Sequence, residues 1–234
     1  MEQASVQLFL LPFAGGNATS FQKMTEHLDS FIQTVTVEYS GRGSRLNEGD
    51  ITDYGIFRND VVEYIKSHRK KDKPYAIFGY SMGAALAYEI ASQNLLGEAP
   101  VHLFYGARAC IADESLPKLS DEEFIEHAKT MGGFDERVTR NKRLFRLFIH
   151  PLKDDYNIAK QFRFEKGELP FCDCTVLYSE KDTPFDTVRK WKRLTTGKTE
   201  FFEFGNNHFF VLEHYEEIAK IINQTLMKNI RRAR

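Results

Sequence analysis

YAIFGYSMGAAL, residues 75–86, is the stretch that decides how the rest of the chain is interpreted. An apolar run reaches Gly79, Ser81 stands between Gly79 and Gly83, and small residues follow. A strand, a sharp turn carrying G-x-S-x-G and a helix form a nucleophile elbow, which exposes the serine Oγ. Glycines relieve the crowding of such a turn because they lack a Cβ. The alternative is a helix that merely begins with small residues, and we favour a nucleophilic Ser81.

On both sides of this turn, segments with the pattern of buried strands alternate with segments of helical spacing. The strand-like segments are short, apolar and often followed by glycine turns, whereas the helical ones place apolar residues three and four positions apart. This alternation predicts an α/β fold with a mostly parallel sheet and helices on both faces. The strand-like segments are 6–13, 31–40, 75–79, 101–107, 175–180 and 199–205, and the helical ones are 54–69, 82–93, 186–194 and 209–230. In 54–69 the apolar positions are Ile56, Phe57, Val61, Tyr64 and Ile65.

The alternation is interrupted between about residues 111 and 166, where no strand-like segment occurs. Ser120 and Glu123 have the spacing of a capping box at the start of one helical segment. Residues 137–162 continue with helical periodicity and several aromatic side chains. Ligand sites of open α/β sheets lie at the carboxyl ends of the strands. We therefore expect one domain over residues 1–234, with a helical lid inserted at about 111–166 over those ends.

A nucleophilic serine at such a turn needs a histidine base, which follows the serine and the acid in the sequence. His208 comes directly after the strand-like segment that ends at Gly205, so it belongs to a loop at the carboxyl end of a strand. His214 lies six residues into the last helical segment, and we favour His208 over it. The remaining histidines fail the order or spacing (His27, His68 and His102) or lie in the insertion (His127 and His150).

The orienting acid is expected at the end of the strand-like segment that precedes the histidine. Asp182 lies just beyond segment 175–180, before the helix that begins near Pro184. Asp173 lies at the other end of that strand, and Asp186 is already within the helix. Glu180 is the second choice after Asp182.

The oxyanion of an acyl-transfer reaction needs two N–H donors. One is the backbone N–H of Met82, which follows the serine and lies at the N-terminus of a helix, where negative charge is favoured. The other should come from the loop after an earlier strand. Residues 12–16, PFAGG, are such a loop, and Phe13 and Ala14 are the candidate donors. A simple tight turn is the alternative interpretation of this stretch.

Composition limits the classes of protein to consider. The chain has 234 residues, a formal net charge of −1 and 42% hydrophobic residues, so it can fill a core and has no overall basic field for nucleic acid. Its three cysteines do not make a secreted disulfide framework. Cys172 and Cys174 are interpreted as strand-entry residues rather than metal ligands. The first apolar run is too short to span a membrane, so we expect a cytoplasmic enzyme.

The chain contains the motifs LLPFAGGNATSF, VEYSGRGSR, GYSMGAALAYEIA, LSDEEFIEHAKTMGG, DDYNIAKQF and FGNNHFFV. Together these motifs resemble the type II thioesterases, stand-alone α/β-hydrolases encoded beside nonribosomal peptide and polyketide synthases. The resemblance runs from about Leu8 to Ile222, and the family's triad falls on Ser81, Asp182 and His208. Tyr80 stands where the family often has histidine, Ser40 where it often has proline, and GNNH replaces the usual double glycine before the histidine.

The resemblance implies hydrolysis of acyl groups from the phosphopantetheine arm of an acyl or peptidyl carrier protein, which would regenerate misprimed carriers. It implies no metal and no organic cofactor. The expected partner is the carrier and neither nucleic acid nor a membrane, and we expect a monomer. Carrier proteins of this class are acidic, so basic residues of the insertion, Arg140 and Arg143 among them, are candidates for docking, although a solvated helix face is the alternative. A small-molecule carboxylesterase and a non-catalytic binding module remain the other functional hypotheses.

Overall fold

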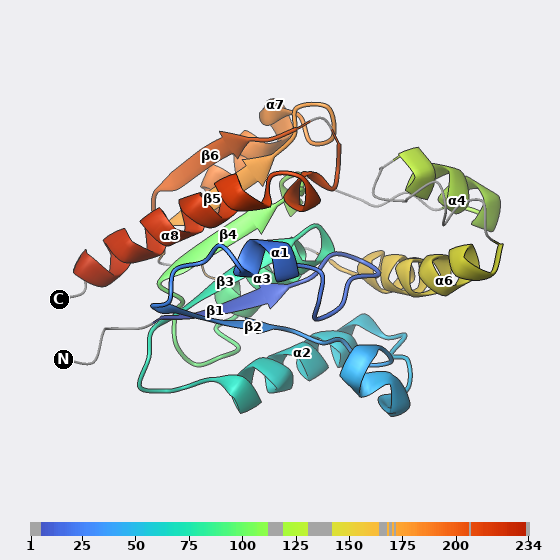
Figure 1. Ribbon diagram of the computed structural model, residues 1–234. Coiled ribbons are helices and arrows are strands. Elements are labelled where there is room, and N and C mark those ends of the chain that lie inside the picture. Colours follow the sequence, from blue (N-terminus) through green and yellow to red (C-terminus); the bar gives the residue numbers. More distant parts are fainter. Residues whose placement is uncertain are drawn as a thin grey trace.

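Six parallel strands form one sheet (Figure 1). The computed structural model describes residues 6–111, 119–130, 142–163, 168, 170, 172–205 and 207–232. The strand order is β2-β1-β3-β4-β5-β6, which confirms the predicted parallel α/β architecture. The strands are β1 (Val6–Leu11), β2 (Ile32–Thr36), β3 (Tyr75–Tyr80), β4 (His102–Gly106), β5 (Cys174–Tyr178) and β6 (Thr199–Glu203).

Helices cover both faces of the sheet, and this explains why the strands were recognisable as apolar runs. All residues of β1, β3, β4 and β5 are buried, as is typical of parallel strands enclosed on two sides. One face packs against α2 (Tyr54–His68), α3 (Met82–Ser92) and the 3-10 helix η3 (Arg189–Leu194). The other packs against α1 (Gln22–Thr25) and α8 (Tyr215–Arg232). The shorter elements are η1 (Gly43–Glu48), α7 (Phe185–Val188) and η4 (Phe210–Leu212).

Helix α2 shows how local sequence sets an element and its buried face. Asp53 caps it by accepting a hydrogen bond from the Ile56 N–H at 2.9 Å. Phe57, Val61 and Ile65 face the core, as their spacing predicts. Ile56, another apolar residue of this segment, is 61% exposed in the first turn and does not belong to the buried face.

Two of the predicted helices differ from the helices in the structure, one in its type and the other in its first residue. The helix expected over 186–194 is only one turn of α-helix, α7, followed by the 3-10 helix η3. The tighter path lets Trp191 reach the core, where it stacks on Tyr105 and donates a 3.0 Å hydrogen bond to the Arg108 carbonyl. The last helix, α8, begins at Tyr215, so His214 precedes it and does not lie inside it as predicted.

Between β4 and β5 the structure describes two helices, α4 (Asp121–Thr130) and α6 (Lys142–Ala159). They lie beyond the carboxyl ends of the strands, away from the body of the sheet (Figure 1). The capping box at α4 is formed as expected: Ser120 N–H donates to Glu123 Oε2 at 2.8 Å, and Glu123 N–H to Ser120 Oγ at 3.3 Å. The two helices share an apolar cluster of Phe124, Ala128, Ile149, Leu152 and Tyr156. Their role as a lid remains a prediction.

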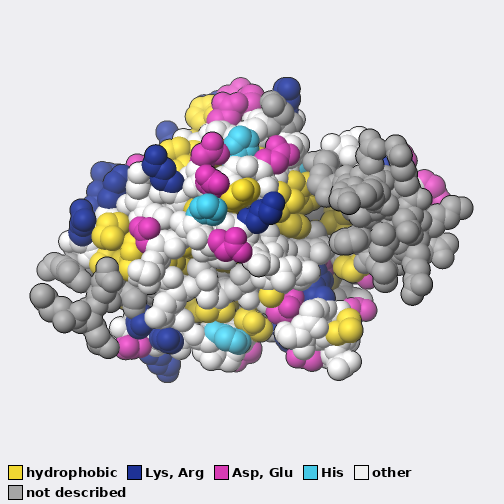
Figure 2. Space-filling model, viewed as in Figure 1, with side chains coloured by type: hydrophobic (Ala, Val, Ile, Leu, Met, Phe, Trp, Pro, Cys, Tyr) yellow, Lys and Arg dark blue, Asp and Glu magenta, His cyan; other side chains and the backbone are white. Residues whose placement is uncertain are grey.

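Charge is spread evenly over the surface that can be seen. In Figure 2, basic and acidic side chains are interspersed over the face that carries α1 and α8. This mixture agrees with the formal net charge of −1. None of the described helices is long and apolar enough to cross a membrane.

Candidate active site

Ser81 lies in a strained turn between β3 and α3. Its backbone has φ 54° and ψ −110°, an unusual conformation for a residue other than glycine. A Cβ on Gly79 would lie 2.2 Å from the Gly83 carbonyl oxygen, and one on Gly83 would lie 2.1 Å from the Leu11 carbonyl oxygen. Both positions therefore require glycine. The Ser81 N–H donates to the Gly106 carbonyl at 2.8 Å, which ties the turn to the end of β4.

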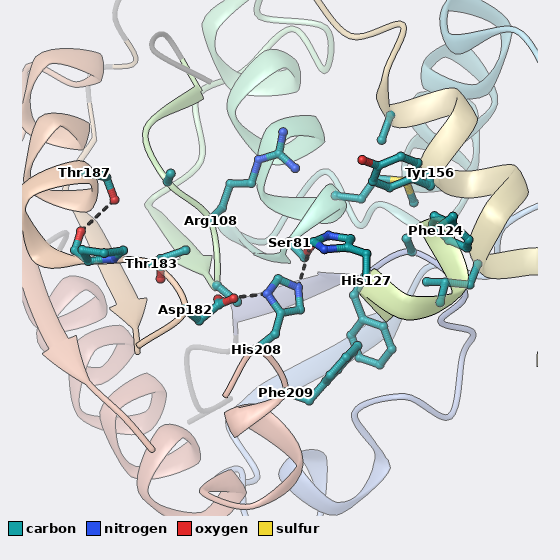
Figure 3. A pocket seen from close by; sticks show the side chains of 18 residues that line it. Ser81, Arg108, Phe124, His127, Tyr156, Asp182, Thr183, Thr187, His208 and Phe209 are labelled. Carbon is teal, nitrogen blue, oxygen red and sulfur yellow. Dashed lines mark hydrogen bonds and ion pairs between the residues drawn. The ribbon is translucent and has the colours of Figure 1, made fainter. Parts of the chain in front are cut away.

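His208 and Asp182 lie on two other loops at the same carboxyl end of the strands, and the His208 side chain contacts both Asp182 and Ser81. His208 Nε2 lies 3.0 Å from Ser81 Oγ, and His208 Nδ1 lies 2.9 Å from Asp182 Oδ2 (Figure 3). Asp182 belongs to the turn after β5, and His208 follows β6. The arrangement suits a neutral imidazole that donates Nδ1–H to the carboxylate and accepts the serine proton at Nε2. The structure thus brings together the serine, acid and base chosen from the sequence.

The other candidate acids have different partners in the structure. Glu180 Oε2 accepts the Phe185 N–H at 2.9 Å, at the beginning of α7. Asp186 pairs with Arg189 at 3.0 Å on the surface. Asp173 precedes β5 and therefore lies at the amino end of the strands, opposite Ser81, as expected. None of these three carboxylates hydrogen-bonds His208 within the part of the chain that the structure describes.

Two other histidines have structural surroundings. His214 lies between η4 and α8, and its Nδ1 contacts Glu217 Oε2 at 2.8 Å. His102 lies at the opposite end of the sheet from Ser81, with its Nε2 2.9 Å from Thr175 Oγ1. Burial lowers the pKa of His102 to about 4, because desolvation disfavours the charged imidazolium. His102 is therefore a neutral core histidine near neutral pH.

The loop that carries His208 is held by Tyr80, which stands where the type II thioesterases that the chain resembles often have histidine. The fully buried phenol donates to the His208 carbonyl at 2.7 Å and accepts the Val211 N–H at 3.4 Å. A Cβ on Gly106 would lie 2.5 Å from the Tyr80 ring, so glycine at this position makes room for the side chain. Asn207 completes the turn, with its Oδ1 accepting the Phe209 N–H at 2.8 Å.

The predicted oxyanion donors lie around the same point. Met82 is the first residue of α3, and the first N–H groups of a helix have no partner within it. In the loop after β1, the N–H groups of Gly15, Gly16, Asn17 and Ala18 all have acceptors. Among the described residues no acceptor takes the N–H of Phe13 or Ala14. The N–H groups of Phe13 and Ala14 therefore stay the predicted candidates for the second donor.

A cavity of about 360 Å³ opens in front of Ser81. Its walls are mostly apolar, and α4 and α6 supply one side of them (Figure 3). The lining includes Phe13, Ala14, Ser81, Met82, Ala107, Arg108, Ala109, Phe124, His127, Leu152, Tyr156, Ala159, Asp182, Thr183, Pro184, Thr187, His208 and Phe209. A pocket of this composition suits an apolar chain attached to a reactive polar group.

Two groups of residues from the sequence analysis lie elsewhere. Cys172 and Cys174 are buried at the start of β5, and burial raises the pKa of their thiols to about 12 and about 11. Over the described ranges, no cluster of three or more His, Cys, Asp or Glu could hold a metal ion. Arg140 lies outside the described residues, and Arg143 lies on α6 with its side chain outside them.

Comparison with known proteins gives the same picture over nearly the whole chain. The model of the thioesterase domain family matches residues 6–226. The thioesterase PikA5 of Streptomyces venezuelae is 27% identical over 231 residues, 96% of this chain and 82% of the relative. The linear gramicidin dehydrogenase LgrE of Brevibacillus parabrevis is 26% identical over 235 residues, 96% of this chain and 89% of the relative.

A solved structure is similar in fold as well as in sequence. ClbQ, from the nonribosomal peptide and polyketide synthase pathway of colibactin, superposes with a TM-score of 0.87 at 28% identity. The match covers 96% of this chain and 98% of ClbQ. This chain and ClbQ therefore share one fold over nearly their whole length.

Proposed function

This chain belongs to the thioesterase family, and from that premise we propose that it hydrolyses the thioester joining an acyl group to the phosphopantetheine arm of a carrier protein. The observation that carries the proposal is the continuous contact from Asp182 through His208 to Ser81, at the mouth of an apolar cavity. A nucleophile, a base and an orienting acid in this order perform acyl transfer.

In the first half of the proposed reaction, Ser81 takes the acyl group from the carrier. Its Oγ bonds to the thioester carbonyl carbon while its proton passes to His208 Nε2, and Asp182 stabilises the imidazolium that forms. The oxyanion accepts hydrogen bonds from the N–H of Met82 and from Phe13 or Ala14. Collapse of the tetrahedral intermediate breaks the C–S bond, and the departing sulfur takes the proton from Nε2.

In the second half, water removes the acyl group from the enzyme. His208 accepts a proton from the water as its oxygen bonds to the acyl carbon, and the same oxyanion donors hold the negative charge. The C–Oγ bond then breaks and Ser81 recovers its proton from His208. The products are a carboxylic acid and a carrier with a free thiol. This chemistry requires neither a metal nor an organic cofactor.

The proposed partner is a phosphopantetheinylated acyl or peptidyl carrier of a nonribosomal peptide or polyketide synthase. The colibactin pathway of ClbQ, a similar structure, supports this assignment. The cavity provides apolar walls for an acyl chain. The basic residues Arg140 and Arg143 are proposed to contact the acidic carrier, with the chain acting as a monomer in the cytoplasm.

The redox activity stated in the name of LgrE has no support in this sequence. A dinucleotide-binding α/β fold carries G-x-G-x-x-G in the turn after its first strand. Residues 12–18 here read PFAGGNA. Hydrolysis by the serine is therefore the better assignment, and a small-molecule carboxylesterase remains the alternative to be tested.

The test compares two substrates and two forms of the chain. Wild type is expected to release the acyl group from an acylated carrier with a higher kcat/KM than from an aryl ester of the same acyl group. Ser81→Ala should lose both activities by several orders of magnitude. A preference for the aryl ester would favour the carboxylesterase. A variant that keeps more than about a tenth of wild-type turnover would remove Ser81 from the mechanism.

A further inference from the structure

We propose that Asp155, together with Arg42, is a positioning residue that holds the oxyanion loop, residues 12–18, in its donor geometry. The inference deepens the proposed function and rests on it, since the loop matters only if Ser81 attacks a carbonyl. It also makes the part of α6 around Asp155 a fixed component of the active site.

Asp155 lies on α6 and is fully buried. Its Oδ2 accepts the Gly15 N–H at 2.6 Å and a hydrogen bond from Arg42 Nη1 at 2.8 Å. Its Oδ1 accepts Arg42 Nη2 at 2.6 Å, so the guanidinium is bound through both arms. Arg42 Nη1 also donates to the Gly16 carbonyl at 2.9 Å. One helix residue and one arginine thus bind the N–H of Gly15 and the carbonyl of Gly16, two adjacent residues of the loop.

The remaining contacts of the loop fix it on its other sides. Tyr39 OH donates to the Pro12 carbonyl at 2.8 Å, and the Arg42 guanidinium lies 5.3 Å from the Tyr39 ring centroid. Gly15 has φ +77°, and a Cβ there would lie 3.2 Å from Leu152 Cβ on α6. The helix therefore lies directly on the loop, and a shift of α6 would move Gly15 with it.

The electrostatics favour a positioning role over a purely stabilising one. Burial raises the pKa of the Asp155 carboxyl, and the Arg42 guanidinium acts in the opposite direction. Desolvation of a buried ion pair offsets much of its attraction, so such pairs are weak sources of stability. The pair does fix the orientation of both side chains, because an arginine bound to a carboxylate through two hydrogen bonds has a fixed relative geometry. Here that geometry is transmitted to the Gly15 N–H, one residue from Ala14.

The end of α6 is attached to the body a second time. Gln161 Oε1 accepts the Tyr54 N–H at 3.1 Å, and Gln161 Nε2 donates to the Thr52 carbonyl at 2.7 Å. Pro151 lies four residues before Asp155 and has no N–H for the helical hydrogen bond. Asp155 and Gln161 therefore hold the segment from Pro151 onward to the body of the protein, at Gly15 and Arg42 and at Thr52 and Tyr54.

Asp155→Asn tests the proposal, because it keeps the size of the side chain and removes the charge that binds Arg42. On a small acyl thioester we expect kcat to fall about 10- to 100-fold, by analogy with the loss of one oxyanion donor, with KM within about twofold of wild type. The affinity for a trifluoromethyl ketone analogue of the acyl chain should fall with kcat, because this analogue needs the same donors.

Asp60→Asn is the matched control. Asp60 forms another bidentate pair with an arginine, Arg45, at 2.7 and 2.8 Å, and does not line the cavity. This variant also loses one carboxylate of an ion pair, so its Tm should fall, but its kcat should stay unchanged. Arg42→Lys provides a second variant if Asp155→Asn does not fold, since it keeps the charge and loses the bidentate geometry. A fall in its kcat at constant KM is expected.

The outcomes separate this inference from the function it rests on. Wild-type kcat in a folded Asp155→Asn chain, or in Arg42→Lys if Asp155→Asn does not fold, would overturn the inference. Equal losses of kcat in Asp60→Asn would do the same, since they would reduce the effect to general destabilisation. Absence of thioesterase activity in wild type would count against the proposed function instead.

Discussion

Three side chains that are far apart in the sequence converge on one point, and each reaches it for a different local reason. Ser81 is exposed by a strained turn, and Asp182 follows the end of β5. His208 lies on a loop whose backbone carbonyl accepts a hydrogen bond from the Tyr80 phenol. The distances from His208 Nε2 to Ser81 Oγ, 3.0 Å, and from His208 Nδ1 to Asp182 Oδ2, 2.9 Å, are within the range that proton transfer from the serine to a general base requires. No large rearrangement of these residues is needed before substrate binds.

The two aspartates after β5 differ in their expected importance. Asp182→Asn should lower kcat strongly, because an amide holds the imidazole in the wrong tautomer; in the serine-protease template that change costs about 10⁴-fold. Asp186→Asn is the control, since Asp186 is exposed and pairs only with Arg189 among the described residues. The measurement is kcat for thioester hydrolysis by the two purified variants, which shows which aspartate orients His208. A larger loss in Asp186→Asn would reverse the assignment of the acid.

At the scale of elements, the elbow depends on the close approach of β1, β3 and α3. Gly83→Ala would place a Cβ 2.1 Å from the Leu11 carbonyl oxygen, a contact that only a backbone shift can relieve. We expect a clearly lower Tm together with a loss of kcat, because the shift would move Ser81 and the Met82 N–H. Gly55→Ala near the start of α2 is the control: its Cβ would meet only Asp53 Oδ1, at 3.2 Å, and the helix propensity of alanine offsets that contact, so Tm and kcat should change little. A Gly83→Ala chain with wild-type Tm and kcat would contradict this account of the turn.

How far the elements could be predicted depended on how completely each is buried. Strands covered on both faces appear in the sequence as continuous apolar runs, and β1, β3 and β4 were found for that reason. The segment after Pro184 has mixed periodicity, because Trp191 must reach the core from a 3-10 turn, and its helix was predicted too long. Apolar spacing alone does not decide burial: Ile56 in the first turn of α2 is 61% exposed, whereas Phe57 next to it is buried.

At the scale of the whole molecule, the chemical residues were easier to select than the residues that position them. Serine, acid and histidine follow an order along the chain that can be recognised in the sequence. Tyr80, Arg42 and Asp155 act through contacts with residues at least 26 positions away, which no local pattern encodes. One signal was present: Asp155 falls on the same helical stripe as Leu152 and Ala159, and a carboxylate on an apolar stripe indicates a buried partner.

Docking of the carrier is also a property of the whole molecule. We expect the double change Arg140→Glu and Arg143→Glu to lower kcat/KM on an acylated carrier and to leave hydrolysis of a small thioester nearly unchanged. Charges at the edge of an interface act mainly on the association rate and its salt dependence. Wild-type kcat/KM on the carrier should fall more steeply with salt than on the small thioester. Equal losses on both substrates would indicate a damaged fold, and no loss on either would make these arginines an ordinary solvated surface.

The central claim is that Ser81 carries the acyl group between carrier and water. The most direct measurement is the intact mass of the protein, acid-quenched within the first turnovers on a thioester substrate, followed by peptide mapping. A mass increase of one acyl group on the peptide containing Ser81, absent from Ser81→Ala, is the predicted result. Turnover without acylation of that peptide, continuing in Ser81→Ala, would contradict the account.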